Sequence, residues 1–260
     1  MRADEYAFFD APFLAFAHRG GAAYAPNVGR ENTLHAFGEA VALGYRYLET
    51  DVHATADGGL LAFHDPLLDR VTNGTGAVAS RSSAELVDVL IGGRDRIPTF
   101  TELLEAFPDA RFNVDAKADP AVDLLAAAIA DHDAYDRVCV SSFSPARLHR
   151  LRRRLGARVP TAVSSRGVVL HRFLPWLTRV LDSPAPALQV PLATRLGRRT
   201  VPITTSGLVR AAHRRGKQVH VWTIDDQPTI ERLVDLGVDG IFTDRPNTLK
   251  TVLEDRGLWS

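Results

Sequence analysis

The sequence predicts an α/β protein folded as a (β/α)8 TIM barrel with a small insertion after the second strand. Short apolar runs alternate with segments of helical periodicity along the chain, which is typical of parallel strands joined by helices. Eight such runs can be counted, and a chain of 260 residues is about as long as eight strand–helix units require. Charged residues and histidines follow several of the apolar runs, as expected where barrel strands end at the active-site face.

The first half of the chain supplies three of the eight strands and a shorter apolar run. These segments are 13–17, 45–53, 60–63 (the shorter run) and 111–116. A helix is predicted at 33–43, where apolar residues recur at helical spacing before a glycine. The insertion covers roughly 54–98 and is rich in turn signals. A second helix is predicted to end at 107, with Thr99 or Thr101 as its cap.

The second half of the chain continues the alternation. Its predicted strands are 137–141, 159–163, 188–190, 218–224 and 240–242. Its predicted helices are 121–132, 145–155, 208–215, 228–236 and 246–253. An amphipathic helix is also predicted at 168–181, which would either cover the barrel or form an exposed apolar lip that touches membrane lipid. Because no repeat or linker interrupts the pattern, we expect a single domain over 1–260.

Composition excludes several other classes of protein. The 31 basic and 31 acidic residues give no net charge, which argues against a nucleic-acid partner. One cysteine, Cys139, cannot form a disulfide within the chain. The N-terminus has no apolar signal-peptide core, and no run approaches the ~20 apolar residues that span a bilayer. We therefore expect a cytoplasmic protein.

Three carboxylates on two neighbouring predicted strands suggest a metal site. Glu49 and Asp51 alternate along the end of the second strand, and Asp115 and Lys117 alternate along the end of the third, so each pair shares a face. Carboxylates aimed into a barrel repel one another unless a cation neutralises them, and their oxygens suit Mg²⁺ or Ca²⁺. The alternative is a solvated strand end with salt bridges.

Two histidines provide candidates for proton transfer. His18 follows the first strand and His64 follows the 60–63 run, and an imidazole titrates near neutral pH. Either one alone is more often structural. Arg19 and Lys117 nearby would, however, make a pocket for a phosphate group, and phosphoryl chemistry needs this combination of groups.

Eight short segments together resemble the glycerophosphodiester phosphodiesterase family. They are Ala17-His18-Arg19-Gly20, Glu31-Asn32-Thr33, Glu49-Thr50-Asp51-Val52, Phe63-His64-Asp65, Thr72-Asn73-Gly74-Thr75-Gly76, Ile97-Pro98-Thr99, Val221-Trp222-Thr223-Ile224 and Gly240-Ile241-Phe242-Thr243-Asp244-Arg245-Pro246. They follow the family's order across residues 14–250, so the string as a whole is specific although each segment is short.

The resemblance implies metal-dependent hydrolysis of glycerophosphodiesters to glycerol 3-phosphate and an alcohol, with Mg²⁺ or Ca²⁺ as the cofactor. By position it implies that His18 and His64 are the acid–base pair and that the metal ligands are Glu49, Asp51 and Asp115. The residues implied to bind substrate are Arg19 and Lys117 at the phosphate, Trp222 at the glycerol or head group, and Glu31, which could instead orient Arg19 or cap a helix.

Three alternatives to this reaction stay open at the level of sequence. The first is a lysophospholipase D-like activity on lysophospholipids, which membrane contact through 168–181 would favour. The second is attack on phosphorus by a neighbouring substrate hydroxyl, which gives a cyclic phosphate. The third is a barrel without catalytic activity that binds ligands carrying a phosphate.

Overall fold

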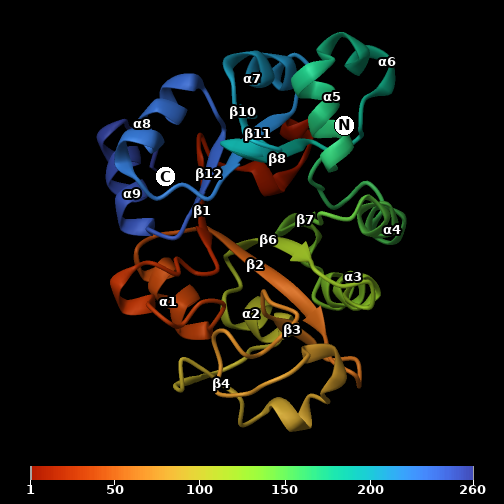
Figure 1. Ribbon diagram of the computed structural model, residues 1–260, viewed down its shortest axis with the longest axis vertical. Coiled ribbons are helices and arrows are strands. Elements are labelled where there is room, and N and C mark those ends of the chain that lie inside the picture. Colours follow the sequence, from red (N-terminus) through yellow and green to blue (C-terminus); the bar gives the residue numbers. More distant parts are fainter. Residues whose placement is uncertain (1, 260) are drawn as a thin grey trace.

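The computed structural model describes residues 2–259, and a curled sheet of parallel strands lies at the centre of the molecule (Figure 1). Within these residues, seven strands pair side by side in the order β7-β6-β2-β1-β12-β11-β8. Their bounds are β1 (Leu14–His18), β2 (Tyr47–Ala54), β6 (Arg111–Ala116), β7 (Val138–Ser141), β8 (Ala187–Pro191), β11 (Gln218–Trp222) and β12 (Gly240–Thr243). Every neighbouring pair in this order is parallel. The predicted α/β barrel class is therefore confirmed.

The prediction of a regular fifth strand at 159–163 was wrong. Segment 159–163 makes two isolated parallel bridges, Val140↔Thr161 and Ala162↔Ala187, which place it between β7 and β8. Pro160 explains the interruption, because proline has no N–H to donate to a strand ladder. Its carbonyl still accepts from the Val140 N–H at 3.0 Å, so the segment fills the gap in the circle without regular pairing.

Helices surround the sheet (Figure 1). They are α1 (Leu34–Ala42), α2 (Phe100–Ala106), α3 (Ala121–Asp131), α4 (Pro145–Leu155), α5 (Ser165–Phe173), α6 (Thr178–Leu181), α7 (Ser206–His213), α8 (Gln227–Leu236) and α9 (Pro246–Asp255). Short 3-10 helices are η1 (Ala3–Glu5), η2 (Ala7–Phe9), η3 (Ala25–Asn27), η4 (Val78–Ser80), η5 (Ala84–Leu86), η6 (Ala134–Asp136) and η7 (Pro175–Leu177). Thr99, rather than Thr101, caps α2, and its side chain forms a capping box with Glu102.

The single helix predicted at 168–181 was also wrong. The chain forms α5, then η7, then α6, with Leu174 between the first two at φ −131° and ψ 50°. Pro175 causes the break, because it disfavours helical geometry at the residue before it and cannot donate to the preceding turn.

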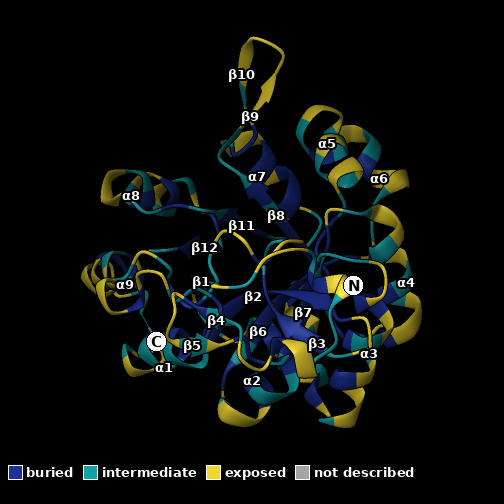
Figure 2. Cartoon of the chain, turned by 60° about the horizontal axis from the view of Figure 1, so that its bottom comes forward, coloured by how far each residue is buried: buried dark blue, intermediate teal, exposed yellow. Residues whose placement is uncertain are grey.

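A hairpin that the sequence did not predict, β9 (Ala193–Leu196) and β10 (Arg199–Pro202), follows β8. It projects from the molecule in Figure 2, and its turn contains Gly197 at φ 61°.

The insertion after β2 has its own apolar cluster. Its first strand, β3 (Leu60–Ala62), pairs antiparallel with the end of β2, and β4 (Leu90–Ile91) pairs with β5 (Asp95–Arg96). The buried members of the cluster are Leu61, Phe63, Leu68, Val78, Leu86, Ile91 and Ile97. The bidentate pair Arg30–Asp95, at 2.6 and 2.7 Å, ties the insertion to the loop before α1.

Strand alternation divides the sheet residues between two cores. On β1, Ala15 and Ala17 face the large core between sheet and helices, whereas Leu14 and Phe16 belong to a separate cluster inside the barrel. Phe8 of η2 joins this inner cluster, and its carbonyl accepts a hydrogen bond from Tyr47 at 2.8 Å. Across residues 2–259 the structure contains no helix long and apolar enough to cross a membrane.

Candidate active site

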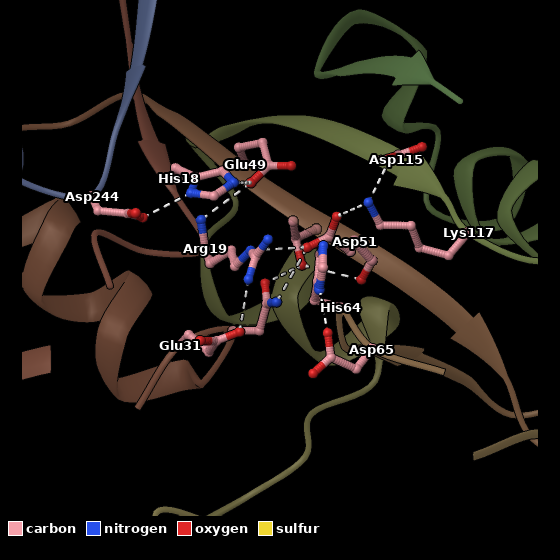
Figure 3. A network of polar contacts seen from close by, with 12 residues as sticks. His18, Arg19, Glu31, Glu49, Asp51, His64, Asp65, Asp115, Lys117 and Asp244 are labelled. Atoms are coloured by element: carbon pink, nitrogen blue, oxygen red, sulfur yellow. Dashed lines mark hydrogen bonds and ion pairs between the residues drawn. The ribbon is translucent and has the colours of Figure 1, made fainter. Parts of the chain in front are cut away.

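The inward-facing positions change from apolar to charged toward the carboxyl ends of the strands. His18 lies two residues beyond Phe16 on β1, and Glu49 and Asp51 lie beyond Tyr47 on β2. The sheet register sets His18 beside Glu49, and Asp51 beside Asp115 of β6. The parallel ladder thus brings together residues that are far apart in sequence, as Figure 3 shows.

His18 is held by a carboxylate on one ring nitrogen. Its Nδ1 lies 2.7 Å from Oδ1 of Asp244, which follows β12, and its Nε2 lies 3.8 Å from Oε2 of Glu49. Asp225 fixes Asp244 in turn, because its Oδ1 accepts from the Asp244 backbone N–H at 2.7 Å. Burial lowers the pKa of His18, but the charge of Glu49 and the hydrogen bond to Asp244 outweigh burial, so the pKa is raised above its ordinary value.

His64 has the same arrangement on the insertion side of the site. Its Nδ1 lies 2.5 Å from Oδ1 of Asp65, and its side chain is 31% exposed. Asp65 in turn accepts from Nε of Arg70 at 2.5 Å. Both histidines therefore have a carboxylate at Nδ1, which leaves Nε2 of each imidazole available for proton transfer.

Arg19 lies between the two histidines and is fixed from several sides. Its Nη1 donates to Oε1 of Glu31 at 3.0 Å, and its Nε lies 3.4 Å from Oδ2 of Asp51. Its backbone N–H lies 3.2 Å from Oε2 of Glu49. Glu31 does not cap α1, because that cap is the side chain of Thr33. Glu31 therefore contacts Arg19 and not the start of the helix. That Glu31 also contacts substrate stays a prediction.

Glu31 also connects Arg19 to the insertion. Its two carboxylate oxygens accept from Nη1 and Nη2 of Arg70 at 2.9 and 2.7 Å. Burial raises the pKa of Glu31, but the bonds and charges of Arg70 and Arg19 outweigh it, so the pKa is lowered. Arg70 thus bridges the partner of Arg19 and Asp65, the partner of His64.

Lys117 joins the other two carboxylates. Its Nζ lies 2.8 Å from Oδ1 of Asp51 and 2.7 Å from Oδ2 of Asp115. Burial opposes the ionised form of Asp51, but Lys117 and Arg19 hold its pKa below the usual value. Burial dominates at Asp115 and raises its pKa despite Lys117. The second oxygen of Asp115, Oδ1, is buried and has no hydrogen-bond partner.

The balance of charge leaves room for a cation. Glu49 is buried next to Asp51, and burial together with that charge raises its pKa to about 7. The unpaired Oδ1 of Asp115 points to the same deficit of positive charge, and three carboxylates are the donor type that Mg²⁺ and Ca²⁺ prefer. Within residues 2–259, however, no three His, Cys, Asp or Glu side chains already form a metal-binding group. Lys117 forms ion pairs with both Asp51 and Asp115.

Two aromatic side chains border the site. Trp222 ends β11 and is half-buried, and Phe143, which follows β7, is 66% exposed. Their rings meet edge to face with centroids 5.8 Å apart, and Nζ of Lys117 lies 5.5 Å from the Phe143 ring centroid. A non-polar portion of a ligand could therefore pack beside the charged groups.

The sequence reasoning missed several residues of this network. Asp65 and Asp244 belong to two of the eight segments that resemble the family. Their spacing does not indicate that each contacts a histidine. Arg70 gave no signal, because it lies in the irregular insertion. Phe143 could have been suspected, since it follows a predicted strand at the end where barrel sites form.

Comparison with known proteins gives a consistent assignment. The model of the glycerophosphoryl diester phosphodiesterase family matches residues 18–248. A Mycobacterium tuberculosis protein named "Probable glycerophosphodiester phosphodiesterase 2" is 39% identical over 254 residues, which covers 95% of this chain and 92% of that protein. A glycerophosphodiester phosphodiesterase of Caldanaerobacter subterraneus subsp. tengcongensis is 31% identical over 258 residues, with coverage of 94% and 99%.

The fold is shared with solved structures as well. A crystal structure from Silicibacter pomeroyi superposes with a TM-score of 0.80 at 24% identity, covering 98% of this chain and 100% of that one. The family model spans the strands from the end of β1 to β12, and both relatives match nearly their whole length. This chain therefore belongs to the glycerophosphoryl diester phosphodiesterase family.

Proposed function

We propose that this chain hydrolyses glycerophosphodiesters to glycerol 3-phosphate and an alcohol, with the help of a bound divalent cation. The observation that supports this most directly is the pair of His–Asp contacts, His18–Asp244 and His64–Asp65, on either side of Arg19. The names of the two relatives support the substrate class, and membership of the family makes the chain a phosphoric diester hydrolase.

The two cations of the site would bind the phosphate group of the substrate. Arg19 presents a guanidinium whose orientation is set by Glu31, and Lys117 presents an ammonium whose orientation is set by Asp51 and Asp115. Charged donors held in place before the substrate arrives stabilise negative charge on phosphate oxygens without reorganising during the reaction.

The two histidines would move the protons. The bond from phosphorus to the leaving alcohol breaks, a new bond forms from phosphorus to the attacking oxygen, and the attacking hydroxyl loses one proton while the alcohol gains one. One imidazole would accept the first proton and the other would supply the second. Asp244 and Asp65 would fix the tautomers by holding Nδ1–H, which leaves Nε2 of His18 and His64 as the atoms that exchange protons.

Glu49, Asp51 and Asp115 would hold the cation. Their oxygens suit Mg²⁺ or Ca²⁺, and the buried Oδ1 of Asp115 is available as a donor. When bound, such a cation neutralises phosphate charge and stabilises the charge that develops during displacement.

A turnover assay with glycerophosphocholine tests the proposal. We expect glycerol 3-phosphate to form with Mg²⁺ or Ca²⁺ and its formation to stop after chelation, then to resume when the metal is restored. Binding of phosphate ligands without product, for every head group tried and with either metal, would contradict hydrolysis and favour a barrel without catalytic activity. Running the assay in ¹⁸O-labelled water, with a search for cyclic phosphate, separates attack by water from attack by a substrate hydroxyl.

A further inference from the structure

Two segments, one after residues 159–163 and one after β8, expose a surface that has no part in the proposed hydrolysis. We call residues 165–181 and 193–202 the basic ledge; they comprise α5, η7, α6, β9 and β10. Figure 2 shows these elements on one side of the molecule, and Nε of Arg172 in α5 donates to the carbonyl of Pro202 in β10 at 3.0 Å, which joins the two parts.

The ledge exposes large apolar side chains in pairs. Trp176 and Val180 stand four residues apart across η7 and α6, and they are 63% and 82% exposed. Val169 and Phe173 form a second exposed pair with the same spacing on α5. A monomer in water gains nothing from such clustering, and exposed apolar groups gathered over neighbouring turns are typical of a contact surface.

The opposite side of these helices is firmly attached, so the exposure does not come from loose packing. His171 and Thr178 are buried. Nε2 of His171 lies 3.0 Å from Oδ1 of Asp182, and Oδ2 of the same carboxylate accepts from Arg215 at 3.2 Å. The apolar residues therefore lie on the face that points away from the barrel.

The ledge is positively charged, although the net charge of the whole chain is zero. The ledge carries no acidic residue and six arginines: Arg166, Arg172, Arg179, Arg195, Arg198 and Arg199. None of the six pairs with an Asp or Glu anywhere in residues 2–259, although most other surface arginines of the chain do. Unpaired arginines beside exposed Trp176 match an anionic lipid surface, where aromatic and apolar groups enter the interface and arginines reach the head groups.

The ledge is connected to the rim of the active site through β8. The β9–β10 hairpin follows β8 directly, and Pro191 at the end of β8 pairs with Trp222 at the rim of the site. We propose that the basic ledge docks the protein on an anionic phospholipid bilayer, with the barrel mouth near the lipid head groups. This goes beyond the hydrolysis proposed above and would be true of an inactive protein.

A second copy of the chain fits the ledge less well. In a two-fold interface the ledge would face its own six arginines without an acidic partner, and like charges that meet across an interface repel each other. A bilayer containing phosphatidylglycerol supplies the missing negative charge.

Vesicle co-sedimentation tests the proposal without any catalytic readout. We expect binding to phosphatidylcholine vesicles that contain phosphatidylglycerol, little binding to phosphatidylcholine alone, and release as salt rises. Arg179→Glu should weaken the partition coefficient by at least about five-fold, and Trp176→Ser combined with Val180→Ser by on the order of ten-fold. All three positions are exposed, so the variants should fold and should hydrolyse glycerophosphocholine like wild type.

Matched controls come from the rest of the surface. Arg232→Glu on α8 and Val87→Ser in the insertion remove an exposed charge and an exposed apolar group outside the ledge, and they should bind vesicles like wild type. Equal effects of ledge and control variants, or no binding by wild type, would overturn the proposal. So would concentration-dependent dimerisation in sedimentation velocity that the Trp176→Ser/Val180→Ser variant abolishes, since a second copy would then occupy the ledge.

Discussion

At the scale of single residues, each candidate catalytic histidine is one half of a His–Asp pair. Asp244 holds Nδ1 of His18 at 2.7 Å, and Asp65 holds Nδ1 of His64 at 2.5 Å. A carboxylate at Nδ1 fixes the ring and stabilises the imidazolium that forms during proton transfer. The first pair lies where β1 and β12 end, and the second lies in the insertion, with Arg19 between the two histidines. This arrangement suits a reaction with one proton donor and one proton acceptor.

Replacing His64 should remove one of these proton transfers. We expect His64→Ala to lower kcat for glycerophosphocholine by on the order of 10²–10⁴ with its fold intact. His149→Ala, which removes an exposed histidine on α4, is the matched control and should keep wild-type kcat. A kcat close to wild type for His64→Ala would exclude this histidine from the mechanism.

Arg70 should act on the reaction through its two neighbours. It holds Glu31, which orients Arg19, and Asp65, which orients His64. We expect Arg70→Met to lower kcat/KM by on the order of ten-fold, because small displacements of both groups are costly in the transition state. Arg70→Lys should restore only part of this loss, since an ammonium cannot form the same fork of hydrogen bonds.

Kinetic constants and the melting temperature together show whether Arg70 positions catalytic groups or only stabilises the fold. In Arg70→Met, kcat should fall by a larger factor than KM rises, because His64 loses the fixed orientation of Asp65, while the melting temperature changes little. Arg94→Met, at an exposed arginine of the same insertion, should leave both unchanged. An unchanged kcat and kcat/KM in Arg70→Met would mean that Arg70 only fastens the insertion.

At the scale of secondary-structure elements, periodic segments were predictable and irregular ones were not. The apolar runs that became β1, β2, β6 and β7 and the helices between them have clear periods of 2 or 3.6 residues. The predictions failed at two prolines. Pro160 interrupts the fifth strand, and Pro175 divides the helix expected at 168–181. The exposed β9–β10 hairpin has no apolar alternation to reveal it.

The same distinction applies to the candidate site. Strand alternation placed Glu49, Asp51 and Asp115 on one face, and the register of β2 and β6 brings two of them side by side. The contacts of Arg70 with Glu31 could not be predicted, because they join an irregular insertion to a loop 39 residues earlier. Nor could alternation reveal that Lys117 lies between Asp51 and Asp115, since the direction of a long side chain depends on its neighbours.

The cap of α2 offers a test at this scale, because the sequence left two candidates. The Thr99 hydroxyl accepts from the Glu102 N–H at 3.2 Å, and Oε2 of Glu102 accepts from the Thr99 N–H at 2.8 Å. Thr99→Ala should therefore lower the free energy of unfolding by about 1 kcal/mol. Thr101→Ala, at the second residue of α2, should change it by less than about 0.5 kcal/mol. Urea denaturation measures both, and equal losses would show that the capping contact adds no stability.

At the scale of the whole molecule, the barrel interior is layered from apolar to charged. Phe16 and Phe242 stack with centroids 4.2 Å apart below the layer of carboxylates. His220 of β11 is fully buried in this apolar layer, 5.2 Å from the Phe16 ring. Its Nε2 lies 2.9 Å from Oε1 of Gln218, and its Nδ1 has no hydrogen-bond partner. Burial lowers the pKa of His220 to about 3.

This buried imidazole makes the stability of the barrel depend on pH. In the unfolded chain the pKa of His220 returns to its ordinary value of about 6.5, whereas the native chain keeps it neutral until about pH 3. Between these values the unfolded state binds one more proton, so the free energy of unfolding falls as pH falls through this window. His220→Gln keeps a hydrogen-bonding side chain but removes the titration, while contributions from the carboxylates cancel in the comparison.

The stability advantage of wild type over His220→Gln should therefore shrink by about 2 kcal/mol between pH 7 and pH 5. Urea denaturation of both proteins at each pH measures the difference, and the comparison above pH 7 gives the cost of the substitution itself. A difference that stays constant from pH 7 to pH 5 would mean that the interior of the barrel admits the charged imidazole, together with water or a partner for Nδ1. The apolar layer beneath the catalytic residues would then be far more polar than its packing of Phe16 and Phe242 indicates.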